Sequence, residues 1–426
     1  MKAAVYVMKT LSVWLLLVLF STACEIPGRP AARGPLTFAG SAVGREADVL
    51  RTQLARFERR TGQHVELRST PDAADIRHQL YVQWLNAHVS DPDVLQLDVI
   101  WTPEFAAAEW VLPLGRFDPP IDEFLPAAIT ANRWNGELFA LPWFVDVGML
   151  YWRTDLNDAP PADFEQLRQQ AADRGALPHG LVWQGARYEG LVTVFLEYLG
   201  AFGGRILDAD GRVAVDSAQA VGALEHMHDA IHANGTVPID VLAWQEEQTR
   251  FAFQNGRAMF MRNWPYAVAL LRDAAASSVA GRFAVAPKPS GPGGPSAAAL
   301  GGSQLAINAR SDRPDAAYAL VEYLLEPEQM LERAREVGQY PARLALYEDA
   351  RLGTSLGVPA REILRIVERA TPRPVTPVYT ELSEILQVHL HRALTRQAAP
   401  ADALRAAASG MRAALARSGL AADGSR

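Results

Sequence analysis

Cysteine is almost absent from this chain, which contains only one, Cys24, among its 426 residues. A single cysteine cannot form a disulfide within the chain, so the folded state must depend on burial of apolar side chains. Lysine is nearly as scarce and occurs only at positions 2, 9 and 288, whereas arginine is abundant. This bias is typical of a GC-rich genome, and we draw no functional conclusion from it.

The signatures of several enzyme and metal-site classes are also missing. The chain has no His-Glu-x-x-His, no Gly-x-x-x-x-Gly-Lys and no cluster of Cys and His, so neither a zinc hydrolase nor a P-loop is indicated. Gly301-Gly302-Ser303 lacks the closing glycine of a nucleophile elbow. We therefore predict no metal, no cofactor and no catalytic residue of these classes.

The first 24 residues have the pattern of an export signal. Lys2 and Lys9 precede an apolar run at 11–20, which is shorter than the roughly 20 residues needed to cross a bilayer. The run leads to Ser21-Thr22-Ala23-Cys24, which resembles the lipobox of bacterial lipoproteins, although Ser21 replaces the usual leucine. The resemblance implies lipidation at Cys24 and an anchored, extracytoplasmic location, in the periplasm or at the outer cell surface. An ordinary cleaved signal with an incidental cysteine is the alternative.

The remaining 402 residues are too many for a single hydrophobic core, so we expect two lobes. Removing residues 1–24 removes two lysines and no acid, which changes the formal net charge from −7 to −9. Because nucleic-acid binding requires a basic surface, this acidic chain is not expected to bind nucleic acid. Residues 25–34, rich in Pro, Arg and Gly, are predicted to form a tether.

Strand-like and helical patterns alternate along the chain. Residues 36–39, 64–67 and 94–101 read as strands, separated by an amphipathic helix at 46–60 and a second helix with Ile76, Leu80 and Trp84 on its apolar face. This alternation predicts an α/β fold with doubly wound, mostly parallel sheets. The apolar segment 141–153 is predicted to be one long strand that runs from one lobe into the other, and the chain beyond residue 314 is predicted to be mostly helical.

Isolated acids and aromatic residues are the best candidates for function. Asp98 and Asp146 interrupt apolar strands, and Trp264 follows another strand. A charge within an apolar run is unfavourable unless it gains a partner, so each aspartate is expected to be either paired in a salt bridge or functional. Carboxylates that accept hydroxyl hydrogen bonds, together with an indole that covers a pyranose ring, are typical of sugar recognition.

A family resemblance adds to this interpretation. Several segments resemble, in the same order, the solute-binding proteins of sugar ABC importers, and most closely those that bind trehalose or maltose; they are 91–101, 110–114, 141–156, 184–191, 260–265, 300–302 and 373–379. The resemblance implies a two-lobed periplasmic-binding-protein fold of type II with crossing hinge strands. The lobe boundaries that we predict are 35–144 with 285–336 for the N-terminal lobe and 145–284 with 337–417 for the C-terminal lobe.

The resemblance also implies roles for particular residues. The ligand-binding residues carried over are Glu46, Asp98, Phe144, Asp146, Tyr188, Glu189, Trp264, Gly301, Gly302, Ser303 and Arg373. Phe144 and Ser303 depart from the family, in which Tyr and Trp are common at these positions, so an altered ligand specificity is an open hypothesis. The implied partners are a small carbohydrate and the permease subunits of an ABC importer, with the protein acting as a monomer.

Two other functions remain open at this point. In an exported glycoside hydrolase, Asp98 and Asp146 would be the acid and the nucleophile. A lipoprotein that binds a peptide or protein would instead show an exposed apolar patch. We favour the non-enzymatic capture of a disaccharide or small glycoside.

Overall fold

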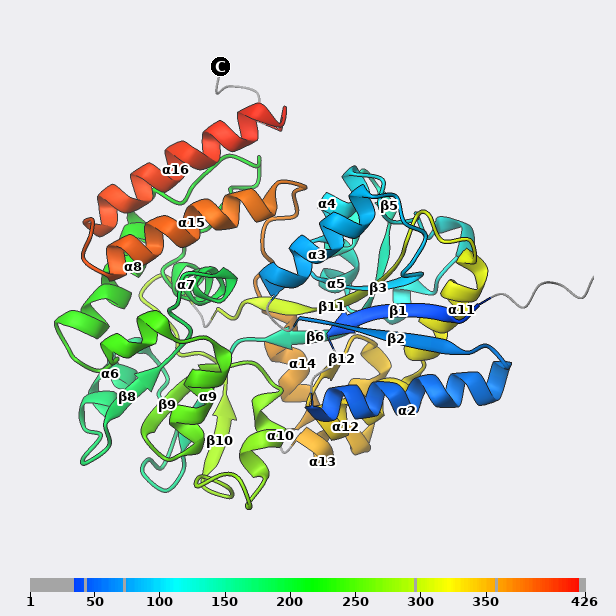
Figure 1. The fold of residues 1–426 in the computed structure, drawn as a ribbon. Coiled ribbons are helices and arrows are strands. Elements are labelled where there is room, and N and C mark those ends of the chain that lie inside the picture. The colour runs from blue at the N-terminus through cyan, green and yellow to red at the C-terminus, as the bar shows by residue number, and fades with distance from the viewer. Residues whose placement is uncertain (1–33, 42–43, 72–73, 295–296, 357–358, 421–426) are drawn as a thin grey trace, which may run out of the picture. The chain divides into compact units, whose positions relative to one another are not determined.

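The larger of two main sheets draws its strands from both halves of the chain. The computed structural model describes residues 34–41, 44–71, 74–294, 297–356 and 359–420. By their contacts, Leu36–Arg426 form one compact unit, and the fold described below is that of this unit. Its six-stranded sheet has the order β12-β6-β11-β3-β1-β2 (Figure 1). The strands are β1 (Leu36–Ser41), β2 (Val65–Thr70), β3 (Val94–Asp98), β6 (Ala140–Val147), β11 (Leu300–Ile307) and β12 (Tyr340–Pro341).

The pairing in this sheet corrects one prediction. Strands β2, β1 and β3 are parallel, as the alternation of strands and helices indicated. Strands β11, β6 and β12, however, pair antiparallel to their neighbours, so the sheet is mixed rather than mostly parallel. The antiparallel strands come from the apolar run at 140–147 and from later parts of the chain, whose direction in the sheet local periodicity does not encode.

The second main sheet has four strands in the order β10-β7-β9-β8. They are β7 (Met149–Arg153), β8 (His179–Val182), β9 (Ala258–Asn263) and β10 (Phe283–Ala286). Only β8 and β9 are parallel, so the expectation of a mostly parallel sheet is wrong here as well. A separate hairpin pairs β4 (Arg133–Trp134) with β5 (Glu137–Leu138).

Helices pack around both main sheets, and the chain beyond residue 314 is largely helical, as predicted. The α-helices are α2 (Gly44–Thr61), α3 (Ala74–Asn86), α4 (Thr102–Ala107), α5 (Pro126–Ala131), α6 (Phe164–Ala172), α7 (Glu189–Ala201), α8 (Ala218–His232), α9 (Glu246–Gln254), α10 (Ala267–Arg272), α11 (Pro314–Leu324), α12 (Pro327–Val337), α13 (Ala350–Leu356), α14 (Ala360–Glu368), α15 (Tyr379–Leu394) and α16 (Pro400–Arg417). Short 3-10 turns are η1 (Gly115–Phe117), η2 (Ile121–Glu123), η3 (Ile239–Ala243) and η4 (Leu344–Glu348).

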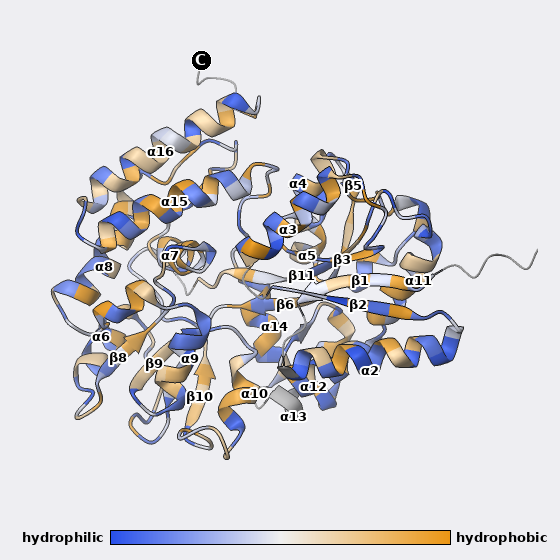
Figure 2. Ribbon diagram, viewed as in Figure 1, coloured by the Kyte–Doolittle hydropathy of each residue, from blue (hydrophilic) through white to orange (hydrophobic). Residues whose placement is uncertain are grey.

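Helices α2 and α3 show how far periodicity predicts burial. Leu50, Leu54 and Phe57 of α2 are buried as predicted. The α3 helix forms, but its buried residues include Tyr81 and Leu85, whereas Ile76, assigned to the apolar face, is 56% exposed. Edge strand β2 carries both hydrophobic and hydrophilic residues (Figure 2), and its charged residues Glu66 and Arg68 discourage pairing with another chain.

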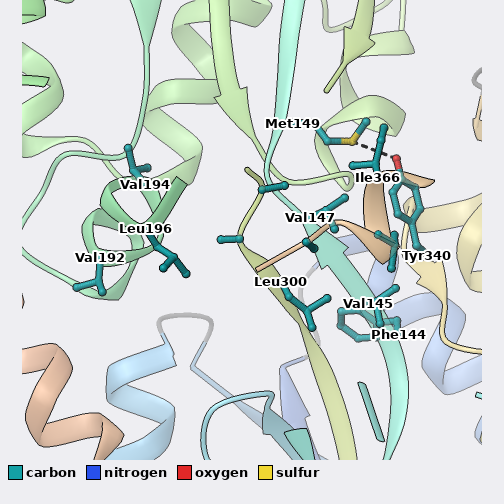
Figure 3. Packing of buried hydrophobic residues seen from close by; sticks show 14 of the residues in the cluster. Phe144, Val145, Val147, Met149, Val192, Val194, Leu196, Leu300, Tyr340 and Ile366 are labelled. Carbon is teal, nitrogen blue, oxygen red and sulfur yellow. Dashed lines mark hydrogen bonds between the residues drawn. The ribbon is translucent and has the colours of Figure 1, made fainter. Parts of the chain in front are cut away.

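Three chain segments cross between the two sheets and hydrogen-bond to one another. The predicted long strand at 141–153 is instead two strands, because the chain breaks pairing at Gly148 between β6 and β7. The amide of Gly148 donates to the carbonyl of Ala299 (3.3 Å), and Leu300 and Ala298 exchange backbone hydrogen bonds with Thr371. Buried apolar residues pack around this crossing, including Val147, Met149, Leu300 and Tyr340 (Figure 3).

The exact lobe boundaries stay a prediction. The six-stranded sheet includes β12, which falls within the segment 337–417 that we assigned to the C-terminal lobe. Below, "first lobe" means the six-stranded sheet with its helices α2–α5, α11 and α12, and "second lobe" means the four-stranded sheet with α6–α10, α15 and α16. The signal at 1–24, Cys24 and nearly all of the tether at 25–34 lie outside the described residues.

Candidate functional site

Asp98 is the last residue of β3, so it ends a buried strand rather than interrupting one. The predicted strand stops short of Trp101, which packs in a buried cluster with Phe105 and is not available to a ligand. The Asp98 carboxylate is partly exposed and accepts hydrogen bonds from the Ile100 amide (3.3 Å) and from Nη2 of Arg373 (3.2 Å). Asp98 therefore lies at the carboxyl end of a central strand, with Arg373 as its cationic partner.

Arg373 joins Asp98 to the second lobe. Its Nη1 donates to Oε1 of Glu189 at the start of α7 (2.8 Å). Although burial opposes the charge, the Asp98 and Glu189 carboxylates raise the pKa of Arg373 above its usual value. Glu189 is buried and also accepts hydrogen bonds from the hydroxyls of Tyr379 and Ser383. Its carboxylate is thus occupied by protein donors and positions Arg373, and a direct ligand contact for Glu189 stays a prediction.

Asp146, on β6, is the predicted site residue with the fewest internal partners. Its carboxylate is partly exposed and makes no hydrogen bond or ion pair with any residue in the described ranges. Burial, followed by the charges of Glu46 and Asp98, raises the pKa of Asp146 to about 7, while Arg262 opposes the rise. The structure therefore brings three predicted acids, Glu46, Asp98 and Asp146, within electrostatic range of one another.

Gly301 links this acidic group to the predicted indole. In the sheet, Gly301 on β11 lies opposite Asp146 on β6. A Cβ atom at Gly301 would lie 3.3 Å from the Trp264 ring and 3.4 Å from the Cβ of Asp146. Since any side chain at this position would enter the space between the carboxylate and the indole, the glycine leaves the two groups accessible to a shared ligand. Gly302 follows with a φ of 125°, a conformation that favours glycine.

Trp264 is held on three sides. Its Nε1 donates to Oε1 of Glu246 on α9 (3.3 Å), and its carbonyl accepts from the Tyr151 hydroxyl (2.6 Å). The guanidinium of Arg262 lies over one face of the indole, 3.9 Å from the ring centroid. Tyr188 lies close to Glu246, since burial and the Glu246 charge raise the pKa of Tyr188 well above its usual value. Tyr188, Glu246 and Trp264 thus form the second-lobe side of the site.

Glu46, near the start of α2, is held by hydrogen bonds from other residues of the first lobe. Nη2 of Arg333 donates to it (3.0 Å), as does Nε2 of Gln339 (2.8 Å). Arg333 is itself buried over the Trp143 ring at 3.8 Å, and burial lowers its pKa to about 10. These donors fix the orientation of a partly exposed carboxylate next to Asp146.

Two predicted residues, Phe144 and Ser303, have buried side chains that are engaged within the first lobe. Phe144 is 6% exposed and packs against Trp143, with ring centroids 5.6 Å apart. The Ser303 hydroxyl accepts a hydrogen bond from Nε2 of Gln96 (2.9 Å), and Gln96 in turn accepts from the Ser41 amide. A ligand contact for either side chain, and the altered specificity that we expect from these two residues, stay predictions.

Sequence reasoning missed several residues that surround this site. Glu246 and Arg262 contact Trp264. Burial, followed by the charges of Asp98, Glu384 and Glu246, raises the pKa of Asp75 on α3, so Asp75 lies within electrostatic range of these carboxylates. An acid at the start of a helix is also a common stabilising residue, so Asp75 and Glu246 carry no distinctive sequence signal. In the described ranges no group of three or more His, Cys, Asp or Glu side chains is placed to hold a metal ion.

The described helices include none that is both long and apolar enough to cross a membrane. Residues 52–355 match the family model of the bacterial extracellular solute-binding proteins. A probable ABC transporter-binding protein of Deinococcus radiodurans is 36% identical over 390 residues, which is 87% of this chain and 91% of that protein.

Solved structures agree with this match. Maltose-bound T. maritima MalE3 is 41% identical and superposes with a TM-score of 0.83, covering 88% of this chain and 98% of that one. The GacH receptor of Streptomyces glaucescens, at 22% identity and a TM-score of 0.81, shares the fold. The predicted two-lobed fold and the predicted kinship with binding proteins of ABC importers are confirmed. Such proteins bind solutes outside the cytoplasm and are not enzymes. The chain belongs to the family of bacterial extracellular solute-binding proteins.

Proposed function

We propose that this protein captures a neutral disaccharide or small glycoside of the trehalose or maltose type in a cleft between its lobes and delivers it to an ABC importer. The observation that carries the proposal is Asp146, a partly exposed carboxylate with no partner among the described residues, separated from the Trp264 ring by Gly301 alone. An ionised carboxylate accepts hydroxyl hydrogen bonds, each contributing roughly 1.5–3 kcal/mol when water is excluded.

The second feature in favour of a sugar is the pairing of the acids with an indole. Arg262 covers one face of Trp264, which leaves the other face for the apolar C–H surface of a pyranose ring. The cations near the site, Arg262, Arg333 and Arg373, are each engaged by a protein carboxylate. An anionic solute would therefore meet unneutralised carboxylates, whereas a polyol gains acceptors. The maltose bound to MalE3, a relative at 41% identity, supports the same class of ligand.

The hydrolase alternative with Asp98 as the acid is disfavoured by the pairing of Asp98 and by the family match. A general acid has to retain a proton, but the Asp98 carboxylate is engaged by the guanidinium of Arg373, a partner suited to its ionised form. The solute is thus expected to leave the protein unchanged. Ligand contacts from the second lobe would shift the population toward a closed state. If the ligand binds the closed state about 5.5 kcal/mol more favourably than the open state, a hundredfold preference for the open state is inverted.

We also propose that Cys24 carries a lipid and keeps the protein at the outer face of the cytoplasmic membrane or in the periplasm, as a monomer beside the permease subunits. Metabolic labelling with an alkyne fatty acid tests this point. The wild type should be labelled and a Cys24→Ser variant should not. Equal labelling of both would overturn the lipid anchor without affecting the sugar proposal.

Isothermal titration calorimetry against trehalose, maltose, sucrose and glucosylglycerol tests the sugar proposal. At least one of these is expected to bind with micromolar or tighter affinity, and chromatography of the mixture should recover it intact. Ser303→Ala is the matched control, because its hydroxyl lies inside the sheet and its loss should leave the affinity unchanged. Failure of all four sugars to bind, or release of monosaccharides, would contradict the proposal.

A further inference from the structure

A buried ion-pair cluster lies directly behind Trp264 and belongs to none of the predicted ligand contacts. Arg262 and Glu197 are both fully buried, and Arg262 donates to the Glu197 carboxylate through Nε (3.1 Å) and Nη2 (2.6 Å). The remaining Nη1 donates to Oε1 of Gln184 (3.1 Å). Lys288, the only lysine outside the signal segment, is buried with its Nζ 3.5 Å from Glu197.

This cluster supports the ring that we assign to the sugar. The guanidinium plane, fixed by Glu197 and Gln184, lies 3.9 Å from the centroid of Trp264. Because every edge of the guanidinium is engaged, the cation cannot turn away from the indole without breaking buried hydrogen bonds. The orientation of the Trp264 ring therefore depends on where the Glu197–Arg262 pair lies.

The same carboxylate also contacts two of the three segments that cross between the lobes. The Ala299 amide, next to the first residue of β11, donates to Oε1 of Glu197 (3.4 Å). At the β6–β7 junction, a Cβ on Gly148 would lie 1.7 Å from Oε1 of Glu197 and 2.7 Å from Nη2 of Arg262. Gly148 must therefore stay a glycine, because its backbone is packed against the ion pair.

We propose that Glu197 and Arg262 are positioning residues that couple the orientation of the Trp264 indole to the crossing segments at Gly148 and Ala299. When those segments bend as the lobes close, the carboxylate moves with them and carries the guanidinium and the indole to the sugar. That the ligand is a sugar rests on the proposed function. The coupling of Trp264 to the crossing segments is independent of that function, and it can be measured without any ligand.

The ligand-free test uses ¹⁹F NMR of the full-length mature protein labelled with 5-fluorotryptophan, with Trp264→Phe identifying the Trp264 resonance. Arg262→Lys, which keeps the charge but removes the planar stacking, should shift or broaden that resonance. Gly148→Ala, which acts from the hinge side, should do the same. Arg153→Lys is the matched control, because Arg153, a buried arginine at the end of β7 in the same sheet, pairs with the exposed Asp155 and not with the indole.

A double-mutant cycle then measures the consequence for binding, with maltose and trehalose as probes. Arg262→Lys should weaken binding about tenfold, as expected for loss of a buried cation–π support. The same substitution should change affinity less than about twofold in a Trp264→Ala background, because its effect passes through the indole. Arg153→Lys should leave the affinity unchanged, and urea unfolding of each variant establishes that it is folded.

A Trp264 resonance that moves in neither Arg262→Lys nor Gly148→Ala would overturn the coupling. Equal losses of affinity with and without Trp264 would also overturn it, since Arg262 would then act on the sugar by another route. If the wild type binds neither probe, the disaccharide proposal fails while the NMR result still decides the positioning role.

Discussion

Replacing Asp146 with asparagine is expected to stabilise the protein without ligand and to weaken its binding of sugar. The Asp146 carboxylate is partly removed from water, lies near the like charges of Glu46 and Asp98, and has no hydrogen-bond donor within the described ranges. Ionising it in the folded protein is therefore unfavourable. An asparagine of nearly the same shape carries no charge and removes this destabilisation.

The sign and size of the effect follow from the two pKa values. The unfolded chain releases the Asp146 proton at the ordinary pKa of 3.8, whereas the folded protein releases it at about 7. Between these values the folded state binds more protons, so the contribution of Asp146 to the free energy of unfolding falls as pH rises. The upper bound on the loss is about 4 kcal/mol above pH 7. Because solvent reaches the carboxylate, we expect about 1–3 kcal/mol.

Urea unfolding between pH 4 and pH 8.5 measures this difference. Asp146→Asn should be more stable than the wild type at pH 8, and the two should converge near pH 4. Asp155→Asn is the control of opposite sign, because Arg153 donates to Asp155 and lowers its pKa, so that removing this charge should destabilise the protein at neutral pH. Equal stability of Asp146→Asn and the wild type across the range would refute the reasoning.

The same titration should govern binding. If sugar hydroxyls donate to ionised Asp146, the wild-type affinity should rise about tenfold from pH 6 to pH 8, because the ionised fraction rises by about that factor. The affinity of Asp146→Asn should be weaker at pH 8 and independent of pH. A wild-type affinity that does not change over this range would show that the ligand does not contact the carboxylate.

Three further expectations follow from the contacts. Trp264→Ala should weaken sugar binding by roughly 1–3 kcal/mol, on the scale of base–aromatic stacking, as measured by calorimetry, and an unchanged affinity would place the ligand elsewhere. Ser303→Ala should lower the free energy of unfolding by about 1 kcal/mol, because Gln96 loses its acceptor, and a large loss of affinity instead would mean that Ser303 contacts the ligand. Glu189→Gln should weaken binding through Arg373, and Arg373→Lys in that background should add little if the two act as a unit.

The sequence was most informative where a single acidic residue stands within an apolar run. Asp146 stands alone in an apolar run, and the structure leaves it without a partner in the described ranges. Asp98 shows the limit of the same argument. It also stands in an apolar run, yet it is paired with Arg373, which is 275 residues away in the chain. An isolated acid can be recognised locally, whereas its partner depends on the fold.

The errors have the same origin. Periodicity placed helix α3 but shifted its buried face: Ile76 is exposed, Trp84 is only partly buried against the core, and the buried positions include His78 and Tyr81. Alternation of strands and helices gave the fold class, but the antiparallel strand β11 returns from residues 300–307 and its direction depends on long-range pairing. Glu197 lies within a continuous apolar helix, and only the structure shows that its partner is Arg262.

Mass spectrometry of the small molecules retained by protein purified from its native host tests the central claim most directly. We expect denaturation of the wild type to release an intact, neutral disaccharide or small glycoside, and the Asp146→Asn, Trp264→Ala double variant to retain none. Release of an amino acid, a peptide or an anionic solute from the wild type would contradict the account, as would equal retention of the sugar by the double variant.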